Sequence, residues 1–118
     1  NINMSKFEIG DFVYDVVLEK TYQNGFTALK IIGFNDKANK YYCLAYDELS
    51  FEPYAIYLIK ESQLEFIKGS KFENYYPERY IVEEQSKTIP IKIIYMYYIY
   101  DVDGLNHKLV RKAILKIN

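Results

Sequence analysis

The stretch IPIKIIYMYYIY, residues 89–100, contains a single charged side chain and restricts how this chain can fold. An extended chain places successive side chains on opposite faces. One face of this stretch carries Ile91, Ile93, Tyr95, Tyr97 and Ile99, and the other carries Lys92, Ile94, Met96, Tyr98 and Tyr100. A strand that is apolar on both faces is covered on both sides by its own protein, or on one side by a partner. The stretch therefore predicts a central buried strand or an interface, including one between copies of this chain.

The same stretch is too short to cross a membrane, because a spanning helix needs about 20 apolar residues and Asp101 ends the run. The N-terminal sequence lacks the basic region and apolar core of a signal peptide. We interpret residues 1–3 as a cloning remnant ahead of a natural start at Met4. The single cysteine, Cys43, cannot form an intrachain disulfide, which agrees with a reducing compartment. These features predict a cytoplasmic protein without membrane contact.

Alternating apolar and polar residues predict strands through the first part of the chain. DFVYDVVLE, residues 11–19, has this pattern. Two further β-rich runs, residues 26–34 and 40–47, are separated by the turn sequence NDKANK, so we expect them to form a hairpin. Residues 55–67 contain two short apolar runs around a polar KESQ break, which predicts two short strands.

The second part of the chain is also β-rich by pattern. Residues 69–78 contain Gly, Ser, Asn and Pro and are predicted to form an irregular loop. Residues 79–118 then form an extension that is too small to fold alone and should pack on residues 4–68. Asp103 and Gly104 are typical of a hairpin turn, which favours a strand over residues 105–117. The four-residue spacing of Leu105, Leu109, Ala113 and Ile117 leaves a helix as the alternative.

The segment FEIGDFVYDV, residues 7–16, followed by ALKIIGF and YYCLAYD, resembles the first strands of small SH3-like barrels of the Tudor and KOW kind. Gly10 permits a tight turn and Asp11 can bond the turn backbone, so that the first strand begins at a fixed place. The resemblance covers about the first 68 residues. It implies that this part of the chain is a small SH3-like barrel. Residues 69–118 fall outside the resemblance, and their own pattern predicts a C-terminal β-hairpin extension, so we expect a mainly β protein. Barrels of this kind bind peptides, nucleic acid or other proteins through loops and aromatic rings.

Aromatic residues are abundant: the chain has 14 Tyr and 7 Phe, and no Trp. A small core does not need so many rings, and Tyr is enriched where proteins bind other proteins. We therefore expect a protein partner, bound by Tyr95, Tyr97, Tyr98 and Tyr100. The alternative explanation is that β-rich proteins from AT-rich genomes accumulate Tyr together with Ile, Lys and Asn.

Charge is unevenly distributed along the chain. Residues 1–68 carry seven Lys against ten acids (−3), and residues 69–118 carry eight basic residues against six acids (+2). The net charge of −1 offers no general attraction to nucleic acid. The candidate contacts to an anionic partner such as nucleic acid are Lys108, Arg111, Lys112 and Lys116. An ordinary solvated face is the simpler interpretation of these four residues.

No motif indicates catalysis, a metal or a cofactor. Cys43 and His107 are the only residues of their kinds, and nothing in their spacing brings them together as a dyad or completes a zinc site. Asp101 and Asp103 fit a turn better than a calcium loop, because the ligands that should follow are replaced by Leu105 and Lys112. The glycines form no phosphate-binding loop.

The function that we predict from the sequence is therefore a non-enzymatic protein-binding module. The small size, the composition and the absence of catalytic motifs further lead us to expect a phage or mobile-element accessory protein that inhibits or modulates a host or defence protein. The alternative is a nucleic-acid-binding barrel that uses the basic C-terminal segment and stacking tyrosines.

Overall fold

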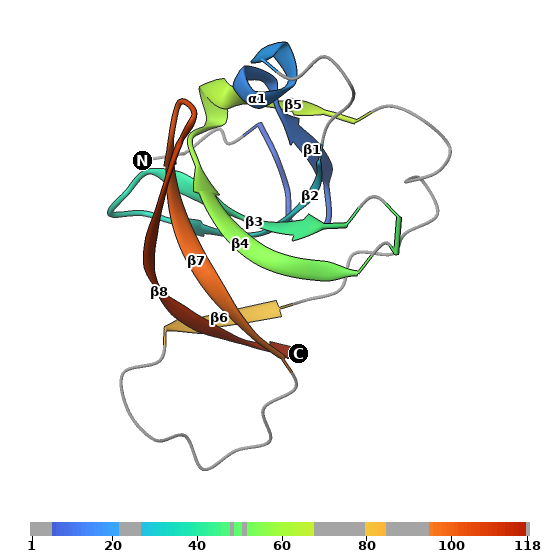
Figure 1. Ribbon diagram of the computed structural model, residues 1–118. Coiled ribbons are helices and arrows are strands. Elements are labelled where there is room, and N and C mark those ends of the chain that lie inside the picture. Colours follow the sequence, from blue (N-terminus) through green and yellow to red (C-terminus); the bar gives the residue numbers. More distant parts are fainter. Residues whose placement is uncertain are drawn as a thin grey trace.

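Eight strands form one continuous sheet in the order β5-β1-β2-β3-β4-β7-β8-β6 (Figure 1). The computed structural model describes residues 6–21, 27–47, 49–50, 52–67, 80–84 and 95–117. The first five strands are β1 (Phe12–Asp15), β2 (Ala28–Asn35), β3 (Lys40–Tyr46), β4 (Pro53–Ile59) and β5 (Leu64–Phe66). The last three are β6 (Tyr80–Glu84), β7 (Tyr95–Asp103) and β8 (Asn106–Ile117). The prediction of a mainly β fold is confirmed.

The turn before β1 forms as the sequence predicts. Gly10 has a φ of 100°, which side chains with a Cβ rarely adopt. The Asp11 Oδ2 atom accepts a hydrogen bond from the Glu8 backbone N–H at 2.8 Å. The Gly10 N–H then donates to the Ile31 carbonyl at 2.8 Å, which connects this turn to β2.

The predicted strand over residues 11–19 is wrong beyond Asp15. The chain turns there into the short helix α1 (Val16–Thr21). The Asp15 Oδ1 atom accepts hydrogen bonds from the backbone N–H groups of Val17 at 2.9 Å and Leu18 at 3.2 Å. This is the bonding of a helix N-cap, which satisfies amide groups that the first helical turn leaves unpaired. Capping by Asp15 therefore overrides the alternating pattern.

The hairpin predicted from residues 26–34 and 40–47 is confirmed as β2 paired with β3. Its turn is closed by Asn35, whose Oδ1 atom accepts a hydrogen bond from the Ala38 N–H at 3.0 Å. Asn39 adopts a positive φ of 57°, which Asn tolerates better than most residues. The two short strands around KESQ are β4 and β5, and the break between them is the 3₁₀ turn η1 (Glu61–Gln63). The predicted irregular loop, residues 69–78, lies outside the described residues.

The C-terminal residues form a strand rather than the alternative helix. β8 pairs antiparallel with β7, and Asp103 lies opposite Asn106 across a two-residue turn. Gly104 occupies the first turn position with a φ of 61°, as in a type II′ hairpin. The hairpin joins the rest of the sheet because β7 runs parallel to β4, with Ile99 opposite Ile56. In Figure 1 this long hairpin crosses the front of the molecule from the η1 end to β6.

Apolar side chains are buried on both faces of the sheet. Alternate residues of β3 belong to different clusters, because Cys43 packs in the first and Leu44 in the second. The first cluster includes Phe7, Val13, Leu29, Ile31, Ile59, Leu64 and Val102. The second includes Phe12, Ala28, Ile32, Ile56, Leu58 and Ile99. The sheet curls so that β6 lies beside β2, but β5 and β6 do not pair within the described residues, so the sheet is not closed.

Candidate functional site

The outward face of the β7–β8 hairpin presents apolar side chains to solvent. Residues directly opposite in an antiparallel pair lie on the same face. Tyr98 lies opposite Lys112, and Tyr100 lies opposite Leu109, so these four side chains and Met96 share one face. Met96 is 46% exposed, Tyr98 47% and Leu109 52%. We call Met96, Tyr98, Leu109 and Lys112 the hairpin face.

On the hairpin face, the Lys112 side chain lies over the ring of Tyr98. The Lys112 Nζ atom lies 5.5 Å from the centroid of the Tyr98 ring. Such a cation–π contact contributes about 0.5–1 kcal/mol at an exposed site. The Tyr98 side chain remains 47% exposed beside this contact.

The strand register separates the tyrosines that the sequence predicts as one partner-binding set. Tyr98 points outward, whereas Tyr97 points to the opposite side and packs against the second core cluster. Tyr100 is half-buried, with its ring centroid 5.7 Å from that of Tyr57. The side chain of Tyr95 lies outside the described residues. Among the described side chains of this set, Tyr98 is therefore the one that is available to a partner without rearrangement.

The predicted basic residues also lie on different faces of the β7–β8 hairpin. Lys108 lies opposite Asp101 and Arg111 opposite Ile99, so both belong to the face opposite the hairpin face. A bulge between these two pairs, at Val110, interrupts the alternation and allows residues 108 and 111 to share a side. Lys112 belongs to the hairpin face, and the side chain of Lys116 lies outside the described residues.

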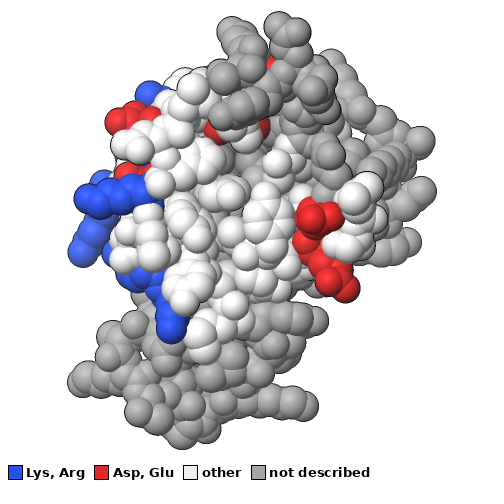
Figure 2. Space-filling view, in the orientation of Figure 1, with Lys and Arg blue, Asp and Glu red and all other residues white. Residues whose placement is uncertain are grey.

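Lys108 and Arg111 line an open groove of about 610 Å³ between β8 and the β2–β3 turn. The turn contributes Asn35, Lys37 and Ala38, and β8 contributes residues 108–111. Leu58 and Asp101 complete the lining. Figure 2 shows basic side chains gathered on the left of the molecule, over β8 and this turn.

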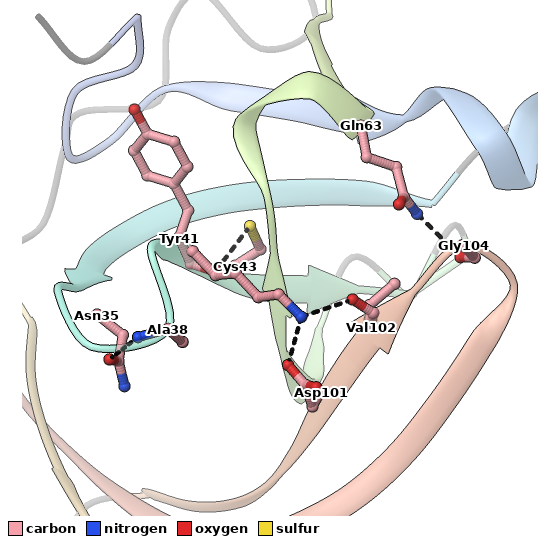
Figure 3. A network of polar contacts seen from close by, with 9 residues as sticks. Asn35, Ala38, Tyr41, Cys43, Gln63, Asp101, Val102 and Gly104 are labelled. Atoms are coloured by element: carbon pink, nitrogen blue, oxygen red, sulfur yellow. Dashed lines mark hydrogen bonds and ion pairs between the residues drawn. The ribbon is translucent and has the colours of Figure 1, made fainter.

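Asp101, the acid among the described residues that line the groove, is paired with Lys40. The Lys40 Nζ atom donates hydrogen bonds to Asp101 Oδ1 at 2.7 Å and to the Val102 carbonyl at 3.0 Å. Figure 3 shows these two bonds, to Asp101 and to Val102, as dashed lines. The Lys40 side chain is only 17% exposed, so this ion pair is partly shielded from solvent. The Asp101 carboxylate is therefore engaged by Lys40 and not by the basic side chains of the groove.

The chain's sole thiol is placed where it cannot act as a nucleophile. Cys43 is completely buried in β3, and its Sγ atom contacts the Tyr41 carbonyl oxygen at 3.7 Å. Burial, and secondarily the negative charge of Asp15, raise the pKa of the thiol far above its ordinary value. The His107 ring packs beside Tyr57, 5.1 Å between centroids. In the described part of the chain, no three His, Cys, Asp or Glu side chains are grouped as metal ligands.

A buried polar contact that the sequence does not reveal connects η1 to the tip of the hairpin. The Gln63 Nε2 atom donates hydrogen bonds to the two carboxylate oxygens of Asp15, at 3.0 Å and 2.9 Å. It also donates to the Gly104 carbonyl oxygen at 2.9 Å, and Figure 3 shows this bond. Asp15 also lines a small cavity of about 30 Å³ with Tyr57 and His107, enough for roughly one water molecule. Asp15 ahead of a helical turn is a detectable capping signal, but nothing in the sequence indicates its bond to Gln63.

Comparison with protein families, with curated proteins and with solved structures finds no match to this chain. In the described ranges, no helix is long and apolar enough to span a membrane.

Proposed function

We propose that this protein is a non-enzymatic protein-binding module and that its binding surface is the hairpin face. The observation that carries the proposal is the exposure of Met96, Tyr98 and Leu109 side by side on one face of β7–β8. Five of the ten large apolar side chains that are exposed in the described residues lie on this hairpin or its turn, so exposed apolar surface is concentrated there. Concentrated apolar surface of this kind is typical of interaction sites.

The chemistry of the hairpin face also supports a protein partner. Tyr offers a stiff ring that buries much area at low entropic cost, and its hydroxyl tolerates partial hydration. Met adapts its shape to an irregular partner surface. Lys112 supplies a positive charge at the rim, where charges act mainly on association rate and specificity.

We further propose that residues 4–68 are a small SH3-like barrel unit, with the β7–β8 hairpin added to its fourth strand. Support comes from the strand order: β1, β2, β3 and β4 are consecutive antiparallel neighbours, and β5 returns to pair with β1. Return of the last strand to the first is the connection that a small barrel requires. In this proposal the barrel is the scaffold and the hairpin carries the binding surface.

The experiment is affinity capture from the native host with three tagged proteins: wild type, Tyr98→Ala and Tyr54→Ala. Tyr54 is the matched control because it is 49% exposed and lies on β4 rather than on the hairpin. We expect a stoichiometric protein partner with the wild type and with Tyr54→Ala. The Tyr98→Ala variant should bind this partner at least roughly tenfold more weakly, since truncating an interface anchor costs about 2 kcal/mol or more.

The melting temperatures of the three proteins must agree, so that lost binding is not lost folding. A partner that depends on Tyr54 and not on Tyr98 would place the binding surface elsewhere and contradict the proposal. Captured material that disappears after nuclease treatment would identify nucleic acid as the ligand and contradict the proposal of a protein partner.

A further inference from the structure

Lys112 is the charged member of the hairpin face, and it lies beside the ring that this face exposes. Tyr98 and Lys112 are directly opposite in the β7–β8 ladder, with the Lys112 Nζ atom 5.5 Å from the centroid of the Tyr98 ring. A Lys ammonium group carries three N–H donors, so the contact with the ring leaves donors for an anionic group. The pair therefore presents an apolar ring and a positive charge side by side.

Lys112 is not neutralised by an acid in the described part of the chain. The ion pairs there are made by Lys6 and Lys40, and Lys112 is exposed. In the ladder, Glu84 and Glu83 of β6 lie opposite the two residues that follow Lys112, and not opposite Lys112 itself. An acid of a partner can therefore reach the Lys112 ammonium group.

The charge of the strands around Lys112 has one sign. Residues 104–117 contain four basic residues and no Asp or Glu, and residues 93–100 contain no charged residue. Figure 2 shows basic side chains over β8 at the left of the molecule. Asp101, which follows the uncharged stretch, is engaged by Lys40 at 2.7 Å. Charges of one sign attract a surface of the opposite sign over about 8 Å at physiological salt, so the hairpin favours an acidic partner.

Apolar surface adjoins this charge on the same face. Met96, Tyr98 and Leu109 are exposed. The bulge at Val110 brings Leu109 onto the face of Lys112, because strict alternation would place residues 109 and 112 on opposite sides of β8. Protein interfaces have apolar centres enriched in Tyr and Met, with polar groups at the rim. The acid that meets Lys112 should therefore be flanked by apolar side chains.

Nucleic acid is a less suitable anion for this face. A phosphate backbone is bound by several basic side chains together. Lys108 and Arg111 lie on the face of the hairpin opposite to Lys112, so the three do not form one row of phosphate contacts. Stacking of successive bases needs several rings, and the hairpin face offers the ring of Tyr98.

We infer that the partner of the hairpin face presents a carboxylate to Lys112 from a segment whose neighbouring side chains are apolar. The carboxylate accepts a hydrogen bond from the Lys112 ammonium group, and the apolar side chains cover the rest of the hairpin face. This contact selects between partners, because a basic residue in the same place would be repelled by Lys112. The inference rests on the proposed function, since it specifies the partner of the same surface.

The test uses the protein that wild type captures and Tyr98→Ala does not, purified and immobilised for kinetic binding measurements. Lys112→Glu should weaken binding at least roughly tenfold, because an attractive charge becomes a repulsive one. Lys112→Arg keeps the positive charge and should bind within about threefold of wild type. Lys60→Glu is the matched control, since Lys60 is exposed and lies outside the hairpin, and the substitution changes the net charge equally. It should bind like wild type, and equal melting temperatures show that each variant is folded.

Chemical cross-linking identifies the group that meets Lys112. A carbodiimide joins a carboxylate to a Lys amine through an amide bond where the two groups are in contact. We expect mass spectrometry of the cross-linked complex to find Lys112 joined to an Asp or Glu of the partner, with apolar residues beside it in the partner sequence. The Lys112→Arg complex should lose this cross-link and keep its affinity, because a guanidinium group does not form the amide.

Equal affinity of Lys112→Glu and Lys60→Glu would overturn the inference. Cross-links that join the partner to other lysines of this chain and not to Lys112 would overturn it as well. Loss of the complex after nuclease treatment would reassign the hairpin face to nucleic acid.

Failure of this inference is distinguishable from failure of the proposed function. If the captured partner depends on Tyr98 but not on the charge of Lys112, the hairpin face remains the binding surface and only the carboxylate contact is wrong. If no captured partner depends on Tyr98, the proposed function itself fails.

Discussion

At the scale of single residues, Gln63 is the side chain that connects η1, β1 and the hairpin tip. Its amide nitrogen lies within hydrogen-bond distance of the Asp15 carboxylate and of the Gly104 carbonyl oxygen, and both Gln63 and Asp15 are buried. If Gln63 is replaced, Asp15 keeps its bonds to the helix N–H groups. The stability is then lowered because the buried Asp15 carboxylate and the Gly104 carbonyl each lose one hydrogen-bond donor. We expect Gln63→Leu to lower the free energy of unfolding by about 1–3 kcal/mol.

Urea denaturation followed by circular dichroism measures this change. Ser62→Ala is the control, because Ser62 is exposed and belongs to the same 3₁₀ turn. A substitution at such a surface position usually changes stability by no more than about 0.5 kcal/mol. Equal stability of Gln63→Leu and Ser62→Ala would mean that the buried contact contributes nothing to the fold.

Cys43 leads to a prediction about reactivity. Because burial raises the pKa of its thiol, the folded protein contains very little of the thiolate that reacts with disulfide reagents. We expect a chromogenic disulfide reagent at neutral pH to modify Cys43 at least roughly tenfold more slowly in the native protein than in denaturant, since each pKa unit changes the thiolate fraction tenfold. Similar rates in both states would show that the thiol is accessible or activated in the native fold.

At the scale of elements, the hairpin turn depends on the backbone of Gly104. Its φ of 61° is strained for residues with a Cβ, but a Cβ built there meets nothing within 4 Å. The cost of Gly104→Ala is therefore purely one of backbone conformation, about 1–2 kcal/mol. We expect a corresponding loss in the free energy of unfolding, measured by denaturant titration.

Gly33→Ala provides the control for this prediction. Gly33 has no positive φ, and a Cβ there would make an ordinary contact of 3.5 Å with the Tyr42 ring. We expect its stability to stay within about 0.5 kcal/mol of wild type. If Gly33→Ala were the more harmful substitution, the turn geometry assigned to Gly104 would be incorrect.

Elements that depend on nearby residues were predictable from the sequence, and elements that depend on distant ones were not. The β2–β3 hairpin and the β7–β8 turn follow from Asn, Asp and Gly at fixed positions. The α1 helix was missed because Val16 and Leu18 continue the alternation while Asp15 caps a helix. The parallel pairing of β7 with β4 has no local signal.

The candidate site was likewise predictable only where it depends on local sequence. The composition of residues 89–100 predicts a strand that is covered on both faces or that lies at an interface, and it does not choose between the two. Which tyrosine faces outward depends on the register against β8 and on the packing of Tyr97 into the core. Likewise, the groove depends on a bulge at Val110 and on the approach of the β2–β3 turn, neither of which the charge pattern contains.

At the scale of the whole molecule, the two parts of the chain share one sheet. β7 pairs with β4 and contributes Ile99 to the cluster that contains Ile56 and Leu58. We therefore expect one cooperative unfolding transition, with amide signals of β3 and β7 lost at the same urea concentration. A chain truncated after residue 67 should fail to unfold cooperatively, because Ile56 and Leu58 lose the contact with β7 that buries them. Two separate transitions, or a stable truncated chain, would show that the parts fold independently.

Hydrogen–deuterium exchange of the purified complex with the captured partner shows whether the β7–β8 hairpin carries the binding surface. The amides of residues 96–98 and 109–112 should exchange more slowly in the complex than in the free protein, because the partner covers the hairpin face. The amides of β1 and β5 should exchange at unchanged rates. Protection confined to β1, β5 or the turn before β1, with the hairpin unchanged, would show that the partner binds elsewhere on the protein.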